Sequence, residues 1–400
     1  MTESLQEKLL PEVLEWAQEM AQCRQDIHQH PDLGYETERT QGKIAAFLKE
    51  HGFETVDTDM SKGSVVAVLE GNRPGATIGI RADMDALPMT ETAGKPYDSV
   101  NPGMAHCCGH DGHTTWLMYA ARYLSQHRDF PGKIVFVFQA AEEKGTGAQT
   151  LVDNGLFEKY PMDEIYGAHS EPNLPVGSIG FKPGPLQAAS DMVYIRVKGH
   201  GCHGGRPHQG IDPIPVAAQI VLAAQTIVSR KVDPIESGVV SLCSINAGRW
   251  EAGNVVPSEC TLSGTIRTFL PQVRDLCEEN LVNMVNGIAK ANGCEVECDY
   301  QRVIGSVINS EEQANAAIEA TRELLGEDRV HIIKPFMSSE DFSVFLDHVP
   351  GNIMRVGMRD ETHTAGLHNT AFDFNDKALL VAVSVICNMA RRRLETLAAR

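Results

Sequence analysis

Several features that would assign a chain to a special class are missing from this sequence of 400 residues. It has no uninterrupted apolar run long enough to cross a bilayer. Residues 1–20 have the pattern of an amphipathic helix and lack the basic start and apolar run of a secretory signal. No internal repeat or low-complexity stretch is present. We therefore expect a globular, cytoplasmic protein with no membrane partner.

Positive charge is in the minority. Lys and Arg together number 35, Asp and Glu number 53, and the formal net charge is −18. Because such a chain repels polyanions, its charge disfavours nucleic acid and anionic membranes as partners. The charge selects no substrate, since surface charge mainly serves solubility.

The ten cysteines lack the spacing of a disulfide or redox framework. The adjacent pair Cys107 and Cys108 could close only a strained ring and is not a Cys-x-x-Cys motif, although a redox switch there is an alternative that thiol counting would test. In the cytosol we expect the cysteines to be reduced, and most of them to be small buried hydrophobes.

The length and rhythm of the chain predict two domains, because 400 residues exceed one ordinary core. Residues 1–190 alternate strand-like and helical segments, which predicts an α/β layered domain with a mostly parallel sheet. Residues 191–301 follow the order β-α-β-β-α-β, the ferredoxin-like motif, and form an inserted α+β domain. Residues 302–400 resume the helix–strand rhythm, and we expect them to rejoin the first domain.

Polar residues follow three of the predicted strands, in "RADMD" (81–85), "QAAEE" (139–143) and "GAHSE" (167–171). Ligands of α/β domains sit beyond the carboxyl ends of the strands. We therefore expect these three polar groups to converge on one site.

The stretch "MAHCCGHDGHT" (104–114) places Cys108 and His110 two residues apart, so both face the same way in an extended loop. Thiolate and imidazole both suit a borderline transition metal. Alone, this spacing is a weak signal, because loop cysteines and histidines more often pack or cap. His106 in the same stretch, like His28 and His30 near the N-terminus, is expected to be structural. His113 is expected to pack or to support a metal ligand rather than to bind metal itself.

The adjacent Glu142 and Glu143 strengthen the case for a metal. Two neighbouring carboxylates at the end of an apolar strand repel each other and are costly to desolvate, unless the strand end is simply hydrated. With a metal, one glutamate ligates and the other acts as general base on water. His169 and His368 could complete the ligand set. Asp85 either orients His110 or caps the turn before a proline.

Eight motifs in one order make the sequence recognisable: "RADMDALPM", "HCCGHDGHT", "AAEE", "GAH", "GCHGGRPH", "NVVP", "MSSEDF" and "LHNTAFDFND". They resemble the metal-dependent amidohydrolases that include hippurate hydrolase, bacterial N-acyl-amino-acid aminoacylases and plant indole-acetyl-amino-acid hydrolases, relatives of carboxypeptidase G. The resemblance covers almost the whole chain. It implies a catalytic α/β domain with two metal ions, and an inserted ferredoxin-like lid that often forms the dimer.

The resemblance also implies a role for individual residues. Glu142 falls on the general base, and His203 on a lid histidine that stabilises the oxyanion, often in the partner subunit's site. Asn254 and Arg267 fall on lid residues that bind the carboxylate end of the substrate. The implied metal ligands are Cys108, His110, Glu143, His169 and His368. Carboxypeptidase-like relatives have His-x-Asp where this chain has Asp83-Met84-Asp85, and a bridging Asp where it has Cys108; both departures fit the hippurate-hydrolase branch.

The implied activity is hydrolysis of an N-acyl amino acid to a carboxylic acid and a free amino acid. Each subunit would hold two divalent ions, manganese or zinc, with nickel or cobalt as further options, and a homodimer would form through the lid. A dipeptidase or carboxypeptidase of the same fold, a deacetylase of acetylated amino acids, and a catalytically silent metal-binding protein are the alternatives. The lid loops "GRPHQG" (205–210) and "NAGRWEAGN" (246–254) are where we expect substrate preference to be set.

Overall fold

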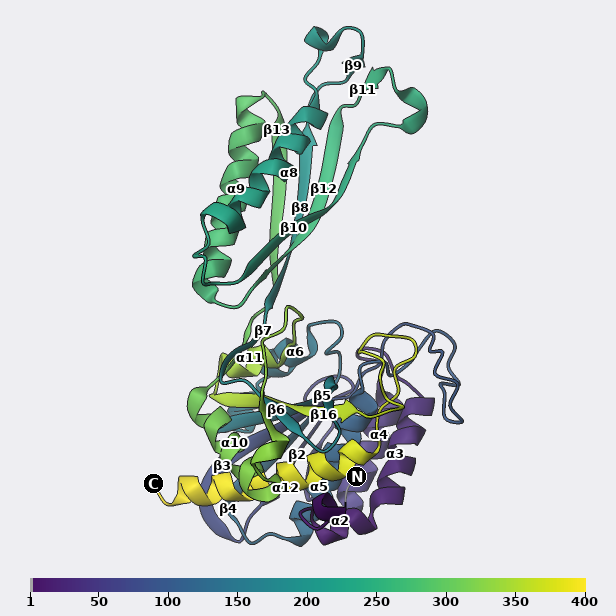
Figure 1. Cartoon of the computed structure of the whole chain (residues 1–400), viewed down its shortest axis with the longest axis vertical. Coiled ribbons are helices and arrows are strands. Elements are labelled where there is room, and N and C mark those ends of the chain that lie inside the picture. Colours follow the sequence, from purple (N-terminus) through teal and green to yellow (C-terminus); the bar gives the residue numbers. More distant parts are fainter. Residues whose placement is uncertain (1–2) are drawn as a thin grey trace. The chain divides into compact units, whose positions relative to one another are not determined.

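The computed structural model describes residues 3–400, which fall into two units (Figure 1). The first unit comprises the chain as far as Gly184, together with Ile308–Lys334 and Asp341–Arg400. The second comprises Pro185–Val307 and Pro335–Glu340. Residues 335–340, expected in the α/β domain, join the second unit, where Phe336 donates its backbone N–H to Leu186. In the described chain no helix combines the length and apolar character that a membrane span requires.

The first unit is built on an eight-stranded sheet in the order β1-β2-β4-β3-β5-β16-β6-β15. Its strands, in chain order, are β1 (Thr55–Asp57), β2 (Val65–Glu70), β3 (Arg73–Asp83), β4 (Pro131–Gln139), β5 (Glu164–Pro175), β6 (Ile179–Phe181), β15 (Val330–Ile332) and β16 (Gly351–Arg359). The central strands β4, β3, β5 and β16 are parallel, whereas β1, β2 and β6 pair antiparallel with their neighbours. The α/β class is confirmed, and the sheet is mixed.

Helices surround this sheet. They are α1 (Glu3–Gln6), α2 (Pro11–Glu15), α3 (Ala17–Gln29), α4 (Glu38–Glu50), α5 (His110–Gln126), α6 (Gly147–Asp153), α7 (Leu156–Lys159), α10 (Glu311–Leu325), η3 (Glu327–Arg329), α11 (Phe342–Leu346) and α12 (Lys377–Ala398). Helices α5 and α12 contact each other and strand β3, and both are buried over most of their length. Apolar residues on every face of α5 explain this burial.

The strand order determines where polar residues meet. Because β4, β3 and β5 are parallel neighbours, their carboxyl ends lie at one edge of the sheet. Strand β3 ends at Asp83, β4 ends just before the twin glutamates, and β5 carries His169. The fold therefore brings these three segments to one place.

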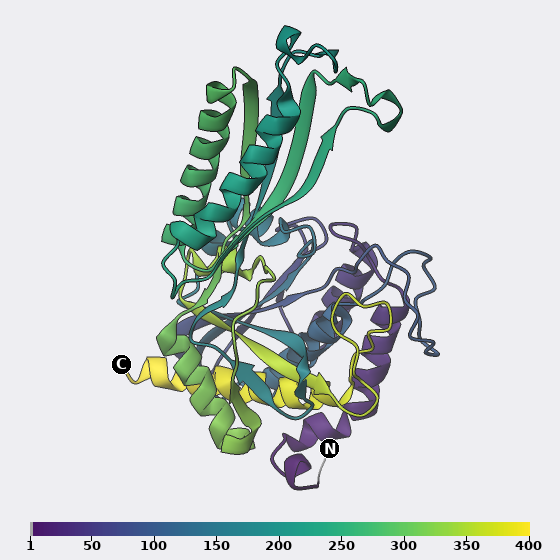
Figure 2. The same ribbon diagram turned by 45° about the horizontal axis from the view of Figure 1, so that its top comes forward.

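The second unit has the chain order β8-α8-β10-β12-α9-β13, and its antiparallel sheet has the order β10-β12-β8-β13. The elements are β8 (Ala189–Lys198), β9 (Cys202–His203), η1 (Pro207–Gln209), α8 (Pro213–Arg230), β10 (Gly238–Ala247), η2 (Trp250–Ala252), β11 (Val255–Val256), β12 (Glu259–Thr268), α9 (Pro271–Ala291) and β13 (Glu295–Ile304), with β7 (Gly184–Gln187) and β14 (Val307–Asn309) at its boundaries. Figure 2 shows α8 and α9 side by side on one face of this sheet. Their apolar sides and the inward strand residues form a separate core.

Candidate active site

The loop before α5 presents two of the predicted ligands. Cys108 is buried, and His110 is the first residue of the helix and fully buried. Between them Gly109 has a φ of +90°, which favours glycine. A Cβ on Gly112 would lie 2.1 Å from the ring of Phe374, so only glycine lets the helix start this close to that ring. The backbone thus fixes the direction of both ligand side chains.

The five predicted ligand residues meet in the first unit, and we call them the ligand cluster: Cys108, His110, Glu143, His169 and His368. The Cys108 Sγ lies 3.6 Å from His169 Nε2, and Cys108, Glu143 and His368 place ligand atoms within 4.8 Å of one another. The Nε2 of His110 lies 3.8 Å from Glu143 Oε1, which lies 3.4 Å from His368 Nε2.

The surroundings of His110 indicate whether a cation fits this cluster. Among the described residues, neither of its two buried ring nitrogens has a hydrogen-bond partner. Buried polar groups are normally hydrogen-bonded, and an orphaned one costs free energy. A borderline metal ion would satisfy Nε2, and thiolate, imidazole and carboxylate are its usual ligands. The donor set therefore fits a divalent cation.

The charges of the cluster depend on one another. Burial and the charge of Glu143 raise the pKa of the Cys108 thiol. Burial opposes charge on His110, yet Asp83 and Cys108 raise its pKa well above the usual range. Burial also opposes ionisation of Glu143, but His368 and His110 lower its pKa. Burial favours the protonated thiol, and the neighbouring anions favour the protonated imidazole, so a metal bound by thiolate and neutral imidazole would release protons here.

Two residues of the cluster region hold a left-handed backbone without being glycine. Ala141, directly before the twin glutamates, has a φ of +60°, and His368 has a φ of +58°. Such a conformation costs about 1–2 kcal/mol per residue and persists only where the surroundings enforce it. Ala141 donates its N–H to Gly34, and His368 donates its N–H to the carbonyl of Cys107 at 2.8 Å. Strain at both positions marks them as functional.

Asp85 holds the twin glutamates. Its carboxylate accepts the backbone N–H of Glu142 at 2.9 Å and that of Glu143 at 3.3 Å. Its Oδ1 also lies 3.7 Å from His110 Nδ1. Of the two roles left open by the sequence, these contacts favour support of the ligands over capping of a turn.

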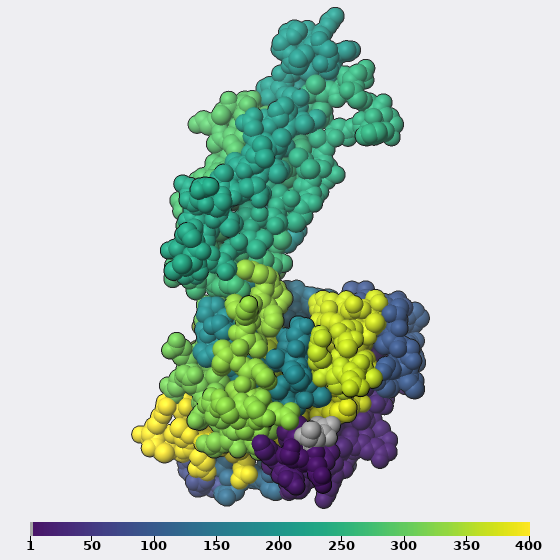
Figure 3. Space-filling view, viewed as in Figure 1, coloured from purple at the N-terminus to yellow at the C-terminus, as the bar shows by residue number. Residues whose placement is uncertain are grey.

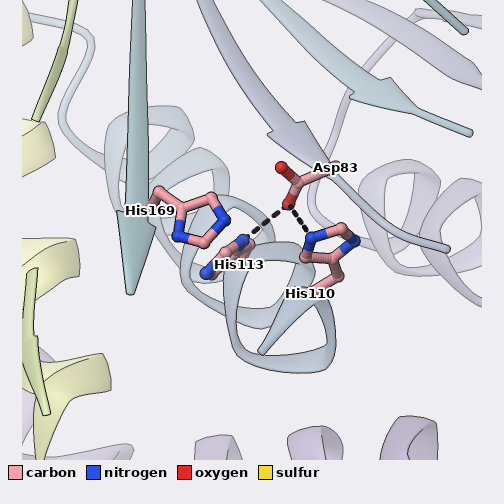
Figure 4. Close-up of side chains that lie close together, drawn as sticks. All are labelled: Asp83, His110, His113 and His169. Atoms are coloured by element: carbon pink, nitrogen blue, oxygen red, sulfur yellow. Dashed lines mark hydrogen bonds and ion pairs between the residues drawn. The ribbon is translucent and has the colours of Figure 1, made fainter. Parts of the chain in front are cut away.

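Figure 4 shows a second group of potential ligands, Asp83, His110, His113 and His169. Both ring nitrogens of His113 are engaged, because Nδ1 donates to Asp83 at 2.5 Å and Nε2 accepts the backbone N–H of Ser170 at 3.0 Å. Burial lowers the pKa of His113, in agreement with this neutral tautomer. His113 therefore has no lone pair left for a metal and instead orients its neighbours.

Ser170 links that histidine to two ligands. Its hydroxyl donates to the carbonyl of Cys108 at 2.9 Å, and its own carbonyl accepts from His169 Nδ1 at 2.9 Å. The Nε2 of His169 is left facing the Cys108 sulfur. Burial and the charge of Arg355 lower the pKa of His169 well below its usual range, which keeps the imidazole neutral, as a metal ligand must be.

Asp83 and Ser170 were not predicted as site residues, and His113 was expected either to pack or to support a ligand. Asp83 is fully buried, and its other oxygen is 2.6 Å from the guanidinium of Arg81, which also pairs with Asp341 at 2.9 Å. A carboxylate at the end of the buried strand β3 was the available signal in the sequence. The tautomer of His113 had no signal, since it depends on contacts between separate strands.

Glu142 lies beside the cluster. Its side chain is buried, and its Oε2 is 4.0 Å from His110 Nε2. The backbone bond to Asp85 fixes the start of its side chain. A carboxylate here can reach a water bound between the ligands and exchange a proton with it.

His203, Asn254 and Arg267 belong to the second unit. His203 on β9 pairs with Val255 on β11, and Gly204 donates its N–H to Asn254 at 2.7 Å. His203 and Asn254 line a cavity of about 1020 Å³. Figure 3 shows the segments around residues 200–210 and 248–253 protruding at one end of this unit.

Arg267 lies elsewhere in the same unit, away from Asn254 of the same chain. It pairs with Ser190, near the other end of β12, and it donates to the hydroxyls of Ser190 and Thr265. Strand β12 begins at Glu259, beside the cavity, and at ~3.4 Å per residue this places Arg267 roughly 27 Å away. Within one chain, Asn254 and Arg267 cannot hold the same small molecule.

Comparisons with known proteins agree with this site. Residues 79–392 match the family model of peptidase family M20/M25/M40. Hippurate hydrolase of Campylobacter jejuni is 38% identical over 391 residues, which cover 97% of this chain and 100% of the relative. N-acetylcysteine deacetylase of Bacillus subtilis is 36% identical over 375 residues, covering 94% and 96%. The crystal structure of a Bacillus subtilis protein described as a dinuclear metal binding peptidase from the M20 family has a TM-score of 0.84 and 33% identity, covering 96% of this chain and 99% of that one.

Proposed function

Because the chain belongs to peptidase family M20/M25/M40, we propose that it is a metal-dependent amidohydrolase that splits N-acyl amino acids into a carboxylic acid and a free amino acid. The meeting of five ligand side chains around the orphaned nitrogens of His110, with Glu142 beside them, carries the proposal. The printed activities of the hippurate hydrolase and N-acetylcysteine deacetylase relatives support this substrate class.

Each residue has a defined task in this reaction. Two divalent cations held by the ligand cluster would lower the pKa of a water and polarise the amide carbonyl. Glu142 takes the proton from the attacking water and passes it to the amide nitrogen as the C–N bond breaks. His203 donates a ring N–H to the oxygen on which negative charge develops. Asp85 fixes the position of Glu142 by accepting its backbone N–H at 2.9 Å.

The donor set narrows the choice of metal. A thiolate among imidazoles favours zinc, nickel or cobalt, and the carboxylate of Glu143 tolerates manganese. We take zinc or manganese as the native ion. Metal analysis of protein purified without chelator, followed by reactivation of the metal-free form with each of the four ions, tests this choice.

Arg267 suits the carboxylate of the substrate. Its guanidinium forms an ion pair with no described carboxylate, and burial lowers its pKa, so an incoming anion would compensate for the lost solvation. A bidentate guanidinium–carboxylate pair would fix the amino-acid end of the molecule. Asn254 and His203 line the cavity beside the start of β12, and the strand places Arg267 roughly 27 Å from that start. The two residues would then serve a different site.

A homodimer resolves this separation, with His203 and Asn254 acting in the site of a second copy. Helix α8 has no charged residue from Pro213 to Ser229 and exposes Ile214 (43%) and Leu222 (71%). Strand β10 beside it is an edge strand. An uncharged helix face next to an open sheet edge suits a second copy of the same surface.

Subunit mixing tests the shared site. Glu142→Gln and His203→Ala homodimers should each be inactive, whereas an equimolar mixture should regain about a quarter of the wild-type rate. Random exchange makes half of the dimers mixed, and each mixed dimer has one complete site of two. Light scattering should show a dimer. No recovery after verified exchange would place His203 in its own subunit's site.

The main experiment is a panel of aromatic, aliphatic and acetyl conjugates of amino acids, assayed with each metal. We expect hydrolysis, and Glu142→Gln should lower kcat by about 10²- to 10⁴-fold while the metal content is unchanged. Cleavage of dipeptides alone would identify a dipeptidase, and no cleavage with any metal would identify a silent metal-binding protein.

We also propose the cytoplasm as the location, since all ten cysteines are unpaired.

A further inference from the structure

The loop between β16 and α12, residues 360–376, carries His368 and is closed at its base by another histidine. His363 Nδ1 lies 2.7 Å from Asp360 Oδ1, and its Nε2 lies 3.4 Å from Asp373 Oδ2. Asp360 directly follows the last residue of β16, and Asp373 lies shortly before α12. The imidazole therefore joins the two stems of the loop. We call His363, Asp360 and Asp373 the loop clasp.

The clasp also ties this loop to a second one, residues 88–104, which ends at the ligand-bearing stretch. Tyr97 donates its hydroxyl to Asp373 Oδ1 at 2.9 Å, and Lys95 Nζ lies 2.7 Å from Asp373 Oδ2. Near the apex, Thr92 donates its N–H to the carbonyl of Thr370 at 2.6 Å. Asp373 is thus the point where both loops meet.

The same contacts continue to the start of α5. Arg24 on α3 stacks over the Tyr97 ring at 4.4 Å and pairs with Asp376 at 2.8 Å. It also lies 3.3 Å from Asp111, the residue after His110. One chain of charged groups therefore reaches from the loop of His368 to the helix of His110.

His368 needs such support more than the other ligands do. It lies in a loop without helix or strand, its backbone is left-handed, and its side chain is 55% exposed. The remaining members of the ligand cluster are buried or nearly so and extend from a strand, a helix start or a strained turn. Without ties at its base, the loop would sample many positions of the imidazole.

We propose that the loop clasp is a positioning device, which holds His368 ready for the cation that it helps to bind and so sets the affinity for that cation. The inference rests on the proposed two-metal function. His363 itself touches no ligand and acts through the loop. Asp373 and Asp360 raise the pKa of His363, which favours the charged imidazole, and a charged imidazole would strengthen both ties.

Removal of His363 should leave the fold intact, because each carboxylate keeps other partners. Asp360 Oδ2 still accepts from Asn375 and Lys377, both at 3.0 Å, and Asp373 keeps Tyr97 and Lys95. No buried charge is then left unpaired. A change in metal affinity can therefore be separated from a loss of stability.

The test is titration of the metal-free protein with zinc, by calorimetry and by chelator competition, for wild type, His363→Gln and Asp373→Asn. We expect the Kd of the zinc that His368 helps to bind to rise at least about tenfold, the Kd of the other zinc to change less than about twofold, and the Tm of the metal-free protein to move little. Asp373→Asn carries the test if His363→Gln does not fold.

His127→Gln is the matched control. His127 Nε2 pairs with Glu12 at 3.1 Å on the surface of the same unit, far in sequence from any ligand, and its loss should change neither Kd. Unchanged zinc affinities in the clasp variants, or an equal weakening of both sites with a large fall in Tm, would overturn the inference. Wild-type protein that binds fewer than two zinc ions would instead contradict the proposed function.

Discussion

The ligand cluster of the first unit and the β9–β11 end of the second are organised in opposite ways. Around the cluster, supporting groups are buried and engaged, as Asp85 is by two backbone N–H groups and His113 by Asp83 and Ser170. At the β9–β11 end, His203 and Asn254 line an open cavity, and nearby Trp250 is 96% exposed. A metal site needs ligands held in advance, whereas a group that acts on another molecule needs access. The first region has the prearranged side chains of a binding site, and the second has the access that a group acting on another molecule needs.

Replacing a ligand should give the largest effect. His110→Ala removes the only pair of orphaned ring nitrogens in the ligand cluster, so the protein should lose metal. Because a bound cation contributes several kcal/mol to such a reaction, kcat/KM should fall by at least about 10⁴-fold. Metal content and rate are measured together. His30→Ala, at the end of α3, should keep both, and a metal-loaded, active His110→Ala enzyme would contradict the assignment.

Buried charge in the first unit should matter far more than exposed charge in the second. Arg81→Met leaves Asp83 and Asp341 buried without their cation and should cost about 3–5 kcal/mol of stability. Arg302→Met removes two exposed pairs of the second unit, with Asp275 and Glu278 at 2.6 Å, and should cost less than about 1 kcal/mol. Urea unfolding of the metal-free proteins compares them. Equal losses would mean that the buried network does not stabilise the site.

Much of the first region could be predicted because its chemistry follows strand ends. Glu142, Glu143 and His169 come directly at the ends of apolar runs, and parallel strands bring such ends together. The antiparallel direction of β1, β2 and β6 escaped prediction, since the residues of a short strand carry no signal of its direction. The partners and tautomer of His113 also escaped prediction, because a neutral tautomer depends on residues from other segments.

The second region was harder to predict for a geometric reason. The roles of Asn254 and Arg267 came from the resemblance alone, and their separation of 13 positions does not say how far apart they lie. The intervening residues instead form the extended strand β12, which separates them. Sequence spacing gives distance only when the local structure is known.

His203→Ala should lower the rate through the second region and leave metal binding in the first region unchanged. Loss of an oxyanion donor lowers kcat by about 10²- to 10³-fold, or roughly 3–4 kcal/mol, and the metal content should be unchanged. His200→Ala, an exposed histidine just before β9 and outside the 205–210 loop, is the matched control and should leave kcat within about threefold of wild type. Loss of metal in His203→Ala would show that the two regions are not separate in function.

The last and smallest effect concerns the pH dependence of stability, which His28 should give to the first unit. Every histidine–carboxylate pair in the described chain lies in that unit. His28 lies 2.9 Å from Asp111 and 2.8 Å from Glu91. Burial would lower its pKa, but the two carboxylates raise it to about 9.

The sign of the pH effect follows from that value. The pKa in the unfolded chain is ~6.5, so the stabilisation by charged His28 is complete below that pH and is lost as the pH rises through about 9. Between pH 7 and pH 9 the loss should be roughly 2 kcal/mol. Unfolding free energies of wild type and His28→Gln over this range measure it. The gap between the two curves should narrow towards high pH, because the variant has no charge to lose. Parallel curves would show that His28 is neutral in the folded protein. Arg24 would then be the charged partner of Asp111.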